Sequence, residues 1–299
     1  MTANSAGQAN RSMRATLAGG DTIVLFGAYD ALSAKVIEQS GSPALFVSGF
    51  GVVGARYGVP DIGLRSFGDI SAAVRDITAA VMIPVLVDAD DGYGDVKNVV
   101  HTVRGYERIG ASAVMIEDQR WPKRCGHMAN KAVVPHGEFV AKIRAAAAER
   151  IDPETMIFAR TDARAVHGLT DALGRAEACL HAGADALFVE APESVDELKR
   201  IGSEFDVPLL ANPLPGGVSP VLTPEEYGEL GFSIVCYGIT PVLTAAGAIR
   251  ARIEDIQQRR FALADRDMSF GDFKDLVGMA EWEAIDERHR KTGGQPGED

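Results

Sequence analysis

Three acidic side chains, Asp88, Asp90 and Glu117, follow two neighbouring apolar segments of the sequence. Asp88 and Asp90 are two residues apart, so a β-strand that continued through them would point both side chains to the same side. The next strand would bring Glu117 beside them. Carboxylate oxygens without a nearby pair of histidines or cysteines suit Mg²⁺, or alternatively Mn²⁺, because these ions accept further oxygens from water and substrate. We therefore predict a metal site at Asp88, Asp90 and Glu117.

A second group of reactive residue types lies in the segment 121–127, which reads Trp-Pro-Lys-Arg-Cys-Gly-His. The potential cations Lys123, Arg124 and His127 flank Cys125. They favour the thiolate and lower the pKa of the thiol from its ordinary value of about 8.5. The segment belongs to a long connection between two strands, and a connection of this length is more often a lid than a spacer. We expect Cys125 to transfer protons.

The segment 49–54 has the spacing Gly-x-Gly-x-x-Gly, which matches a dinucleotide-binding pattern. That pattern should open a helix, but a glycine and a proline interrupt the turn that follows. The repeat of the surrounding chain is also wrong for a nucleotide-binding sheet. We instead expect the backbone amides around Ser48, Gly49 and Phe50 to hold a carboxylate group.

Eight short apolar segments alternate along the chain with stretches of helical periodicity. Most of them are continuously apolar, as expected for parallel strands that are covered on both faces. Eight units of roughly 25 to 30 residues favour a (β/α)8 TIM-type barrel over a doubly wound sheet of five or six strands. The predicted strands are 22–29, 43–47, 84–87, 112–116, 155–159, 184–189, 207–210 and 232–237. The predicted helices include 31–40, 67–80, 96–109, 137–150, 170–182, 248–260 and 269–289.

The whole chain, residues 1–299, is predicted to form a single barrel domain. The barrel spans about residues 21–250, a helical arm follows over about 251–290, and the polar tail 291–299 frays. Chemistry in such a barrel takes place at the carboxyl ends of the strands. Besides the predicted metal ligands, polar residues at those positions include Asp118, Arg160, Asp162, Glu190 and Asn212.

The composition is that of a soluble globular protein, with 46% hydrophobic and 24% charged residues. Its longest apolar run, 77–87, falls short of the roughly 18 residues that a membrane-spanning helix needs. A formal net charge of −12 argues against binding to nucleic acid or to an anionic membrane. Residues 1–20 lack the apolar stretch of an export signal, and three cysteines do not form a disulfide framework, so we expect a cytoplasmic location. Cys179 and Cys236 are expected in the core.

Several of these segments resemble motifs of the isocitrate lyase and phosphoenolpyruvate mutase superfamily, and the resemblance extends over nearly the whole chain. Lys-Arg-Cys-Gly-His at 123–127 is similar to the lid of its methylisocitrate lyase and 2-alkylmalate lyase-like branch. The supporting segments are Ala-Tyr-Asp-Ala-Leu-Ser-Ala at 28–34, Ser-Gly at 48–49, Pro-Asp-Ile-Gly at 60–63, Asp-Ala-Asp at 88–90, Ile-Glu-Asp-Gln at 116–119, Ala-Arg-Thr-Asp-Ala at 159–163 and Leu-Ala-Asn at 210–212. The resemblance implies a barrel whose eighth helix is exchanged between subunits of a homotetramer, with Mg²⁺ near Asp88 and Asp90.

The resemblance also implies an activity, that of a Mg²⁺-dependent carbon–carbon lyase. Such an oxo-acid-lyase cleaves a 2-hydroxy di- or tricarboxylate, of the 2-alkylmalate or 2-methylisocitrate type, to a 2-oxo acid and a carboxylate. Cys125 would then protonate the leaving carbon as general acid, and Arg160 would pair with a carboxylate through two hydrogen bonds. The general base is not assigned. The expected substrate-binding residues are Ser48, Gly49, Phe50, Asp61, Lys123, Arg124, Gly126, His127, Arg160, Glu190 and Asn212.

Two other reactions on the same barrel stay open, oxaloacetate hydrolysis and a carboxyphosphonoenolpyruvate-type phosphonate rearrangement, since one mutase branch shares the cysteine motif. A catalytically silent barrel is a further alternative, which the acidic cluster and the cysteine motif weaken. Two departures from the methylisocitrate lyases favour a dicarboxylate substrate. At strand two, those lyases have a sequence similar to Ser-Gly-Gly-Gly, and Phe50 replaces one of these glycines in this chain. The segment 237–243 also lacks the arginine that a tricarboxylate would need.

Overall fold

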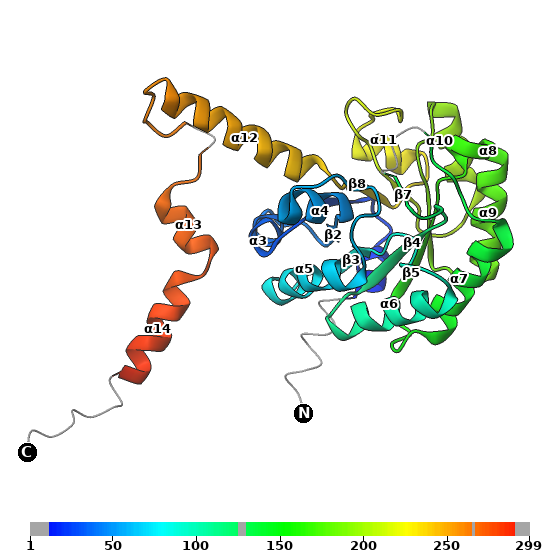
Figure 1. Ribbon diagram of the computed structural model, residues 1–299, viewed down its shortest axis with the longest axis horizontal. Helices are drawn as coiled ribbons and strands as arrows, with labels where there is room; N and C mark the ends of the chain where they lie inside the picture. Colours follow the sequence, from blue (N-terminus) through cyan, green and yellow to red (C-terminus); the bar gives the residue numbers. More distant parts are fainter. Residues whose placement is uncertain (1–11, 125–129, 265–266, 291–299) are drawn as a thin grey trace, which may run out of the picture. The chain divides into compact units, whose positions relative to one another are not determined.

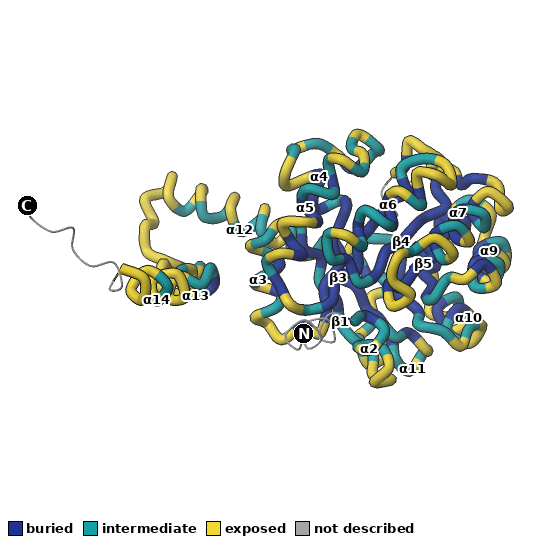
Figure 2. Tube along the Cα trace, turned by 90° about the horizontal axis from the view of Figure 1, so that it is seen from below, coloured by how far each residue is buried: buried dark blue, intermediate teal, exposed yellow. Residues whose placement is uncertain are grey.

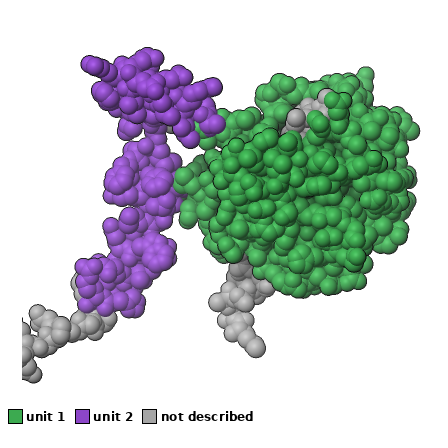
Figure 3. Space-filling model, viewed as in Figure 1, with its two compact units in different colours: residues 1–245 green, residues 246–299 purple. Residues whose placement is uncertain are grey.

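The computed structural model describes residues 12–124, 130–264 and 267–290. Contacts divide the chain into two compact units, residues 1–245 and 246–299 (Figure 3). Every helix in the described ranges is too short or too polar to cross a bilayer.

The first unit contains eight parallel strands surrounded by helices (Figure 1). Neighbouring strands pair in the order β6-β5-β4-β3-β2-β1-β8-β7, and a parallel bridge between Leu187 and Leu209 joins the two ends of this series. The TIM-type barrel predicted from the sequence is therefore confirmed. The strands are β1 (Ile23–Ala28), β2 (Leu45–Val47), β3 (Val85–Asp88), β4 (Ala113–Glu117), β5 (Met156–Thr161), β6 (Ala186–Val189), β7 (Leu210–Ala211) and β8 (Ile234–Tyr237).

Several helices of the first unit begin at capping side chains. Asp95 caps α6, because its carboxylate accepts hydrogen bonds from the amides of Lys97 and Asn98. Ser66 and Asp69 form a capping box at α5, whose bounds agree with the predicted helix. The helices are α2 (Met13–Leu17), α3 (Ala31–Gln39), α4 (Gly49–Tyr57), α5 (Phe67–Ala80), α6 (Val96–Arg108), α7 (His136–Glu149), α8 (Arg164–His167), α9 (Leu169–His181), α10 (Val195–Glu204) and α11 (Pro224–Glu229).

Helix α4 corrects the expectation that the glycine-rich segment after β2 would not open a helix. Ser48 is its N-cap, and the Ser48 hydroxyl accepts a hydrogen bond from the Gly51 amide at 3.1 Å. Gly58 adopts the left-handed conformation, with φ 63°, and ends the helix at its C-cap. Gly58 therefore terminates a helix of about two and a half turns instead of preventing it.

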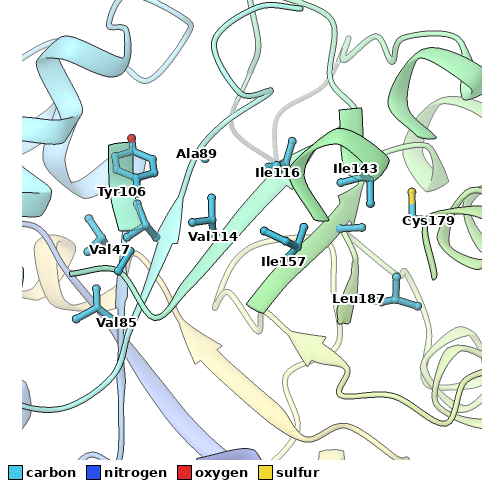
Figure 4. Packing of buried hydrophobic residues seen from close by; sticks show 14 of the residues in the cluster. Val47, Val85, Ala89, Tyr106, Val114, Ile116, Ile143, Ile157, Cys179 and Leu187 are labelled. Atoms are coloured by element: carbon cyan, nitrogen blue, oxygen red, sulfur yellow. The ribbon is translucent and has the colours of Figure 1, made fainter. Parts of the chain in front are cut away.

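Two layers of apolar side chains pack against the two faces of the barrel wall. The interior layer takes alternate residues from each strand, and Met13 of α2 packs with it. The outer layer lies between strands and helices, where Figure 4 shows Val114 and Ile157 of neighbouring strands near Ile143 of α7 and Cys179 of α9. Figure 2 shows the same division, with buried residues along the strands and exposed residues on the outer faces of the helices.

Helix α12 (Thr240–Gln257) crosses the boundary between the units, and α13 (Phe270–Leu276) and α14 (Met279–Arg290) follow. The single helix predicted over 269–289 is wrong, because the chain is interrupted at Gly278, which has a φ of 77°. Large apolar side chains are exposed along this second unit, among them Ile249, Phe261, Phe270 and Trp282. The predicted tail 291–299 lies outside the described residues.

Candidate active site

Six strands each place a polar side chain directly above the interior layer. Each of these side chains follows an interior residue by two positions, in the pairs Phe46 and Ser48, Leu86 and Asp88, Met115 and Glu117, Phe158 and Arg160, Phe188 and Glu190, and Leu210 and Asn212. Residues two apart on a strand point to the same side. The six polar side chains therefore gather at the carboxyl ends of the strands, where they line one cavity of about 50 Å³.

The loops that cover this cavity add three of the other predicted residues, Asp61, Lys123 and Arg124. Phe50, from the first turn of α4, also lines it. Gly49 is buried beside the cavity and approaches the acidic residues, because a Cβ atom at this position would lie 3.0 Å from Oδ2 of Asp88. Most of the predicted binding residues thus meet at one place.

Cys125, Gly126 and His127 lie outside the described residues. Their neighbour Arg124 is held by Gln119, a buried side chain just after β4. The Gln119 amide donates to the Arg124 carbonyl at 2.8 Å and accepts from the Arg124 amide at 2.9 Å.

The two aspartates after β3 are close together, but not through a continuing strand. The strand ends at Asp88, and Asp90 has a left-handed φ of 49°. The Asp90 amide donates a hydrogen bond to Oδ1 of Asp88 at 3.1 Å, and the Asp90 carbonyl accepts one from the Glu117 amide at 2.8 Å. A tight turn, rather than the two-residue period of a strand, therefore brings the three predicted metal ligands near one another.

Lys123 is buried among these carboxylates, with only 4% of its side chain exposed. Its Nζ atom lies 2.6 Å from Oδ2 of Asp61 and 2.7 Å from Oδ1 of Asp90. Burial lowers the pKa of Lys123, but the field of Asp90 and Asp61 outweighs burial and raises this pKa well above its usual range. Lys123 is therefore an ammonium group at this position.

The remaining negative charge of the cluster is poorly compensated. Burial raises the pKa of Asp90 to about 7, against the opposing effect of Lys123. Burial also raises the pKa of Glu117 well above its usual range, although Arg160 opposes the rise. Oε1 of Glu117 is buried and has no hydrogen-bond partner among the described residues. These carboxylates are sites where a further cation would be stabilised.

Arg160 reaches the cavity from β5 and is held in place by buried carboxylates. Its Nε atom donates to Oδ2 of Asp162 at 3.0 Å and lies 3.3 Å from Oε2 of Glu117. Lys131 binds the other oxygen of Asp162 at 2.6 Å. Burial raises the pKa of Asp162, but Arg160 and Lys131 outweigh this effect and lower it overall. Asp162 is thus an anion that fixes the plane of the Arg160 guanidinium group.

A second buried network supports this arrangement, and sequence reasoning did not find it. Asp118 accepts hydrogen bonds from the Thr161 hydroxyl at 2.7 Å, from the Asp162 amide at 2.8 Å and from Arg175 at 3.2 Å. Arg175 also donates to the Val134 carbonyl at 2.9 Å, which ties α9 to the end of the long connection after β4. The sequence did contain a signal for this network, because Arg175 occupies a position among the apolar residues of α9.

Part of the cavity lining is apolar. It is formed by Phe46, Phe50, Met115, Phe188, Leu210, Ile239 and Cys236. Cys236 is buried, as predicted, and also faces this cavity. Burial raises the pKa of its thiol, so this cysteine is a neutral wall residue.

The carboxylate oxygens of this cluster are donors of the type that Mg²⁺ prefers, but they do not form a complete metal site by themselves. No group of three or more His, Cys, Asp or Glu side chains in the described ranges is arranged as a ready metal site. Mg²⁺ commonly uses only one or two carboxylates and completes its shell with water and substrate oxygens. Asp88 and Asp90 can supply that number, and the unpartnered Oε1 of buried Glu117 is a further oxygen beside them.

The chain is similar to known proteins over most of its length. The family model for phosphoenolpyruvate phosphomutase matches residues 13–257. The petal death protein of Dianthus caryophyllus is 40% identical over 272 residues, which cover 90% of this chain and 86% of that protein. The 2,3-dimethylmalate lyase of Eubacterium barkeri is 38% identical over 269 residues, which cover 89% and 93%. The 2-methylisocitrate lyase of Shewanella oneidensis is 40% identical over 244 residues, with 82% of each chain covered.

Solved structures agree with these relationships. Oxaloacetate acetylhydrolase, in complex with the inhibitor 3,3-difluorooxalacetate, superposes with a TM-score of 0.89 at 29% identity, covering 95% of this chain and 97% of that one. Phosphonopyruvate hydrolase, in complex with oxalate and Mg²⁺, superposes with a TM-score of 0.82 at 32% identity, covering 94% and 98%. These proteins include lyases and hydrolases. The chain therefore belongs to the phosphoenolpyruvate mutase/isocitrate lyase superfamily of enzymes.

Proposed function

We propose that this protein is a Mg²⁺-dependent carbon–carbon lyase that cleaves a 2-hydroxy dicarboxylate of the 2-alkylmalate type to a 2-oxo acid and a carboxylate. The observation that carries the proposal is the cavity, in which a fixed guanidinium group, an ammonium group and an excess of carboxylates face one small space. Relatives that are lyases support the same reaction.

Asp88 and Asp90 would hold Mg²⁺, and Glu117 would complete the site. When bound, the ion supplies a Lewis acid that stabilises negative charge on the hydroxyl oxygen of the substrate as the carbon–carbon bond breaks. Mn²⁺ would serve the same purpose.

Arg160 would bind a carboxylate of the substrate, because its guanidinium plane is already fixed by Asp162. Ser48 and Asn212 would orient the substrate from the carboxyl ends of β2 and β7. Cys125 would donate the proton to the leaving carbon. Gln119 supports this role, since it anchors Arg124, the residue before Cys125, at the cavity.

The apolar wall favours a dicarboxylate with an alkyl substituent. Phe50 and Ile239 are among the apolar side chains that line the cavity. Burying an alkyl group there is favourable by about 25 cal/mol per Å² of apolar surface. A tricarboxylate of the 2-methylisocitrate type would place a charge against this wall.

Oxaloacetate hydrolysis is the second candidate, and the overlap with oxaloacetate acetylhydrolase favours it. Phosphonate rearrangement of the carboxyphosphonoenolpyruvate type is the third. Products separate the three. With Mg²⁺ present, a lyase releases a 2-oxo acid from a 2-alkylmalate, and a hydrolase releases acetate and oxalate from oxaloacetate. A mutase rearranges a phosphonate and releases none of these products.

The test is a substrate panel assayed with purified protein by proton and phosphorus NMR. The panel contains 2,3-dimethylmalate, 2-methylisocitrate, isocitrate, oxaloacetate and phosphonopyruvate. We expect 2,3-dimethylmalate to turn over fastest, and Cys125→Ser and Arg160→Lys to reduce kcat/KM about a hundredfold or more. Turnover of Cys125→Ser at the wild-type rate would remove the thiol from the mechanism.

We also propose that the protein is a homotetramer. In α12, the described residues have no buried side chain, and Ile249 is 63% exposed and Ile253 50% exposed. Apolar side chains in such a helix are stabilised when a neighbouring subunit covers them. Light scattering after size exclusion should give the mass of four chains. A monomer mass would contradict the proposal.

A further inference from the structure

Lys131 is a buried lysine that binds the same carboxylate as Arg160. Only 2% of its side chain is exposed, and its Nζ atom donates to Oδ1 of Asp162 at 2.6 Å. The same oxygen accepts a hydrogen bond from Nη2 of Arg160 at 3.3 Å, and Oδ2 of Asp162 accepts one from Nε of Arg160 at 3.0 Å. Asp162 is itself fully buried. One carboxylate therefore bridges Lys131 and Arg160.

Backbone hydrogen bonds fix the segment that carries Lys131. The Arg120 amide donates to the Ala132 carbonyl at 2.7 Å. The Val134 amide donates to the Asp118 carbonyl at 2.9 Å. These bonds join the residues that follow Lys131 to the residues that directly follow β4. The main chain at Lys131 is thus held by contacts that a change of its side chain does not remove.

The charges around Arg160 indicate what a second cation does there. The guanidinium group faces three carboxyl groups, which lie 3.0 Å away in Asp162, 3.3 Å away in Glu117 and 3.9 Å away in Glu190. Arg160 and Asp162 together carry no net charge, so this pair alone would attract a substrate carboxylate weakly. Lys131 adds a positive charge beside Asp162, at a buried position where water screens it little. Two cations and one anion leave a net positive charge where Arg160 lines the cavity.

We propose that Lys131 is a positioning residue for the substrate carboxylate: it neutralises Asp162 and thereby leaves the charge of Arg160 available to the substrate. The inference rests on the proposed function, in which Arg160 binds a carboxylate. Lys131 is not among the described residues that line the cavity, so it acts through Asp162 and not by touching the ligand. Its loss should weaken the binding of a dicarboxylate, which the loss of a purely structural ion pair would not do.

The test measures the binding of succinate to the full-length protein by calorimetry, with Mg²⁺ present. Succinate has the two carboxylates of a 2-alkylmalate but lacks the hydroxyl group at which that substrate is cleaved, so it is not turned over. The test variant is Lys131→Met, which removes the charge and keeps an unbranched side chain of similar length. The control Arg150→Met removes a cation from an ion pair with Asp185, whose carboxylate binds the Ile157 amide at the amino end of β5.

A double variant, Lys131→Met with Asp162→Asn, separates the effect of charge from that of folding. It removes the anion together with the cation, and the new amide oxygen can still accept a hydrogen bond from Arg160. Thermal unfolding of each variant records its stability, so that binding is compared at a temperature where every protein is folded. Should Lys131→Met fail to fold, Lys131→Gln carries the same comparison, because its uncharged amide can still donate to Asp162.

We expect Lys131→Met to bind succinate about tenfold or more weakly than the wild type, and both Arg150→Met and the double variant to stay within about threefold of it. Unchanged binding in Lys131→Met would overturn the inference. Equal weakening in Arg150→Met would overturn it too, and so would a double variant that binds as weakly as Lys131→Met. If the wild type bound no succinate, or Arg160→Lys bound it as tightly as the wild type, the carboxylate site of the proposed function would itself be wrong, and the inference with it.

Discussion

Lys142 forms a buried ion pair with Asp91, in the turn after β3, and its removal gives a direct test of how that turn is held. Lys142 lies on α7, with 2% of its side chain exposed. Its Nζ atom donates to the Asp91 carbonyl at 3.0 Å and lies 3.4 Å from Oδ2 of Asp91. Asp91 directly follows Asp90, so the pair fastens the turn after β3 to a helix.

The substitution Lys142→Met leaves a buried carboxylate without its cation and a carbonyl without its donor. Breaking a buried ion pair by removing one partner costs about 3–5 kcal/mol. A loss of this size should lower the midpoint of thermal unfolding by about 6 °C or more. The double variant Lys142→Met with Asp91→Asn removes both charges, so it should recover about half of the loss.

Urea unfolding followed by circular dichroism measures these differences for the two single variants and the double variant. Lys97→Met is the control, since loss of an exposed lysine should change the free energy of unfolding by about 0.5 kcal/mol or less. A loss of less than about 1 kcal/mol in Lys142→Met would show that this ion pair does not hold the turn. A double variant no more stable than Lys142→Met would show that the cost does not come from the unpaired carboxylate.

Three further predictions concern other parts of the site. Gly49→Ala should keep its thermal midpoint but bind Mg²⁺ about tenfold more weakly by calorimetry, because the new Cβ atom displaces Asp88. Burial and the field of a neighbouring aspartate raise the pKa of Asp118 to about 6, so the folded state holds a proton that the unfolded chain releases. As the pH rises from about 4 to 6, the free energy of unfolding of the wild type, measured in urea, should fall by about 2–3 kcal/mol relative to that of Asp118→Asn. A difference between the two proteins that does not change with pH would contradict this. Burial raises the pKa of Cys179 to about 12 and raises that of Cys236 as well, so a thiol reagent should modify at most one cysteine per native chain.

The strand ends could be predicted because two simple regularities determine them. A buried parallel strand is a continuous apolar run, and the first polar residue after it marks its carboxyl end. Asp88, Glu117 and Glu190 are identified in this way, and the barrel then brings them to one opening. The prediction needs no knowledge of contacts between distant segments.

The partners of the buried basic residues could not be predicted from the sequence. Lys142 occupies an apolar position of its helix, between Phe139 and Ile143, both fully buried, so its burial has a signal in the sequence. Its partner Asp91 has none, because that contact depends on how α7 packs against the turn after β3. Periodicity indicates which face of a helix is covered and leaves open what covers it.

Lys123 shows why the chemistry of a site is harder to predict than its location. Lys123 and Arg124, from the basic segment 123–127, line the cavity, and the sequence alone favoured contact with an anionic substrate. In the folded chain, the anions closest to Lys123 are Asp61 and Asp90, which come from two other loops. A charged side chain binds the opposite charges that the fold places around it, before any ligand arrives. The charge that this cavity offers to a ligand therefore depends on how strongly the protein's own side chains already neutralise one another.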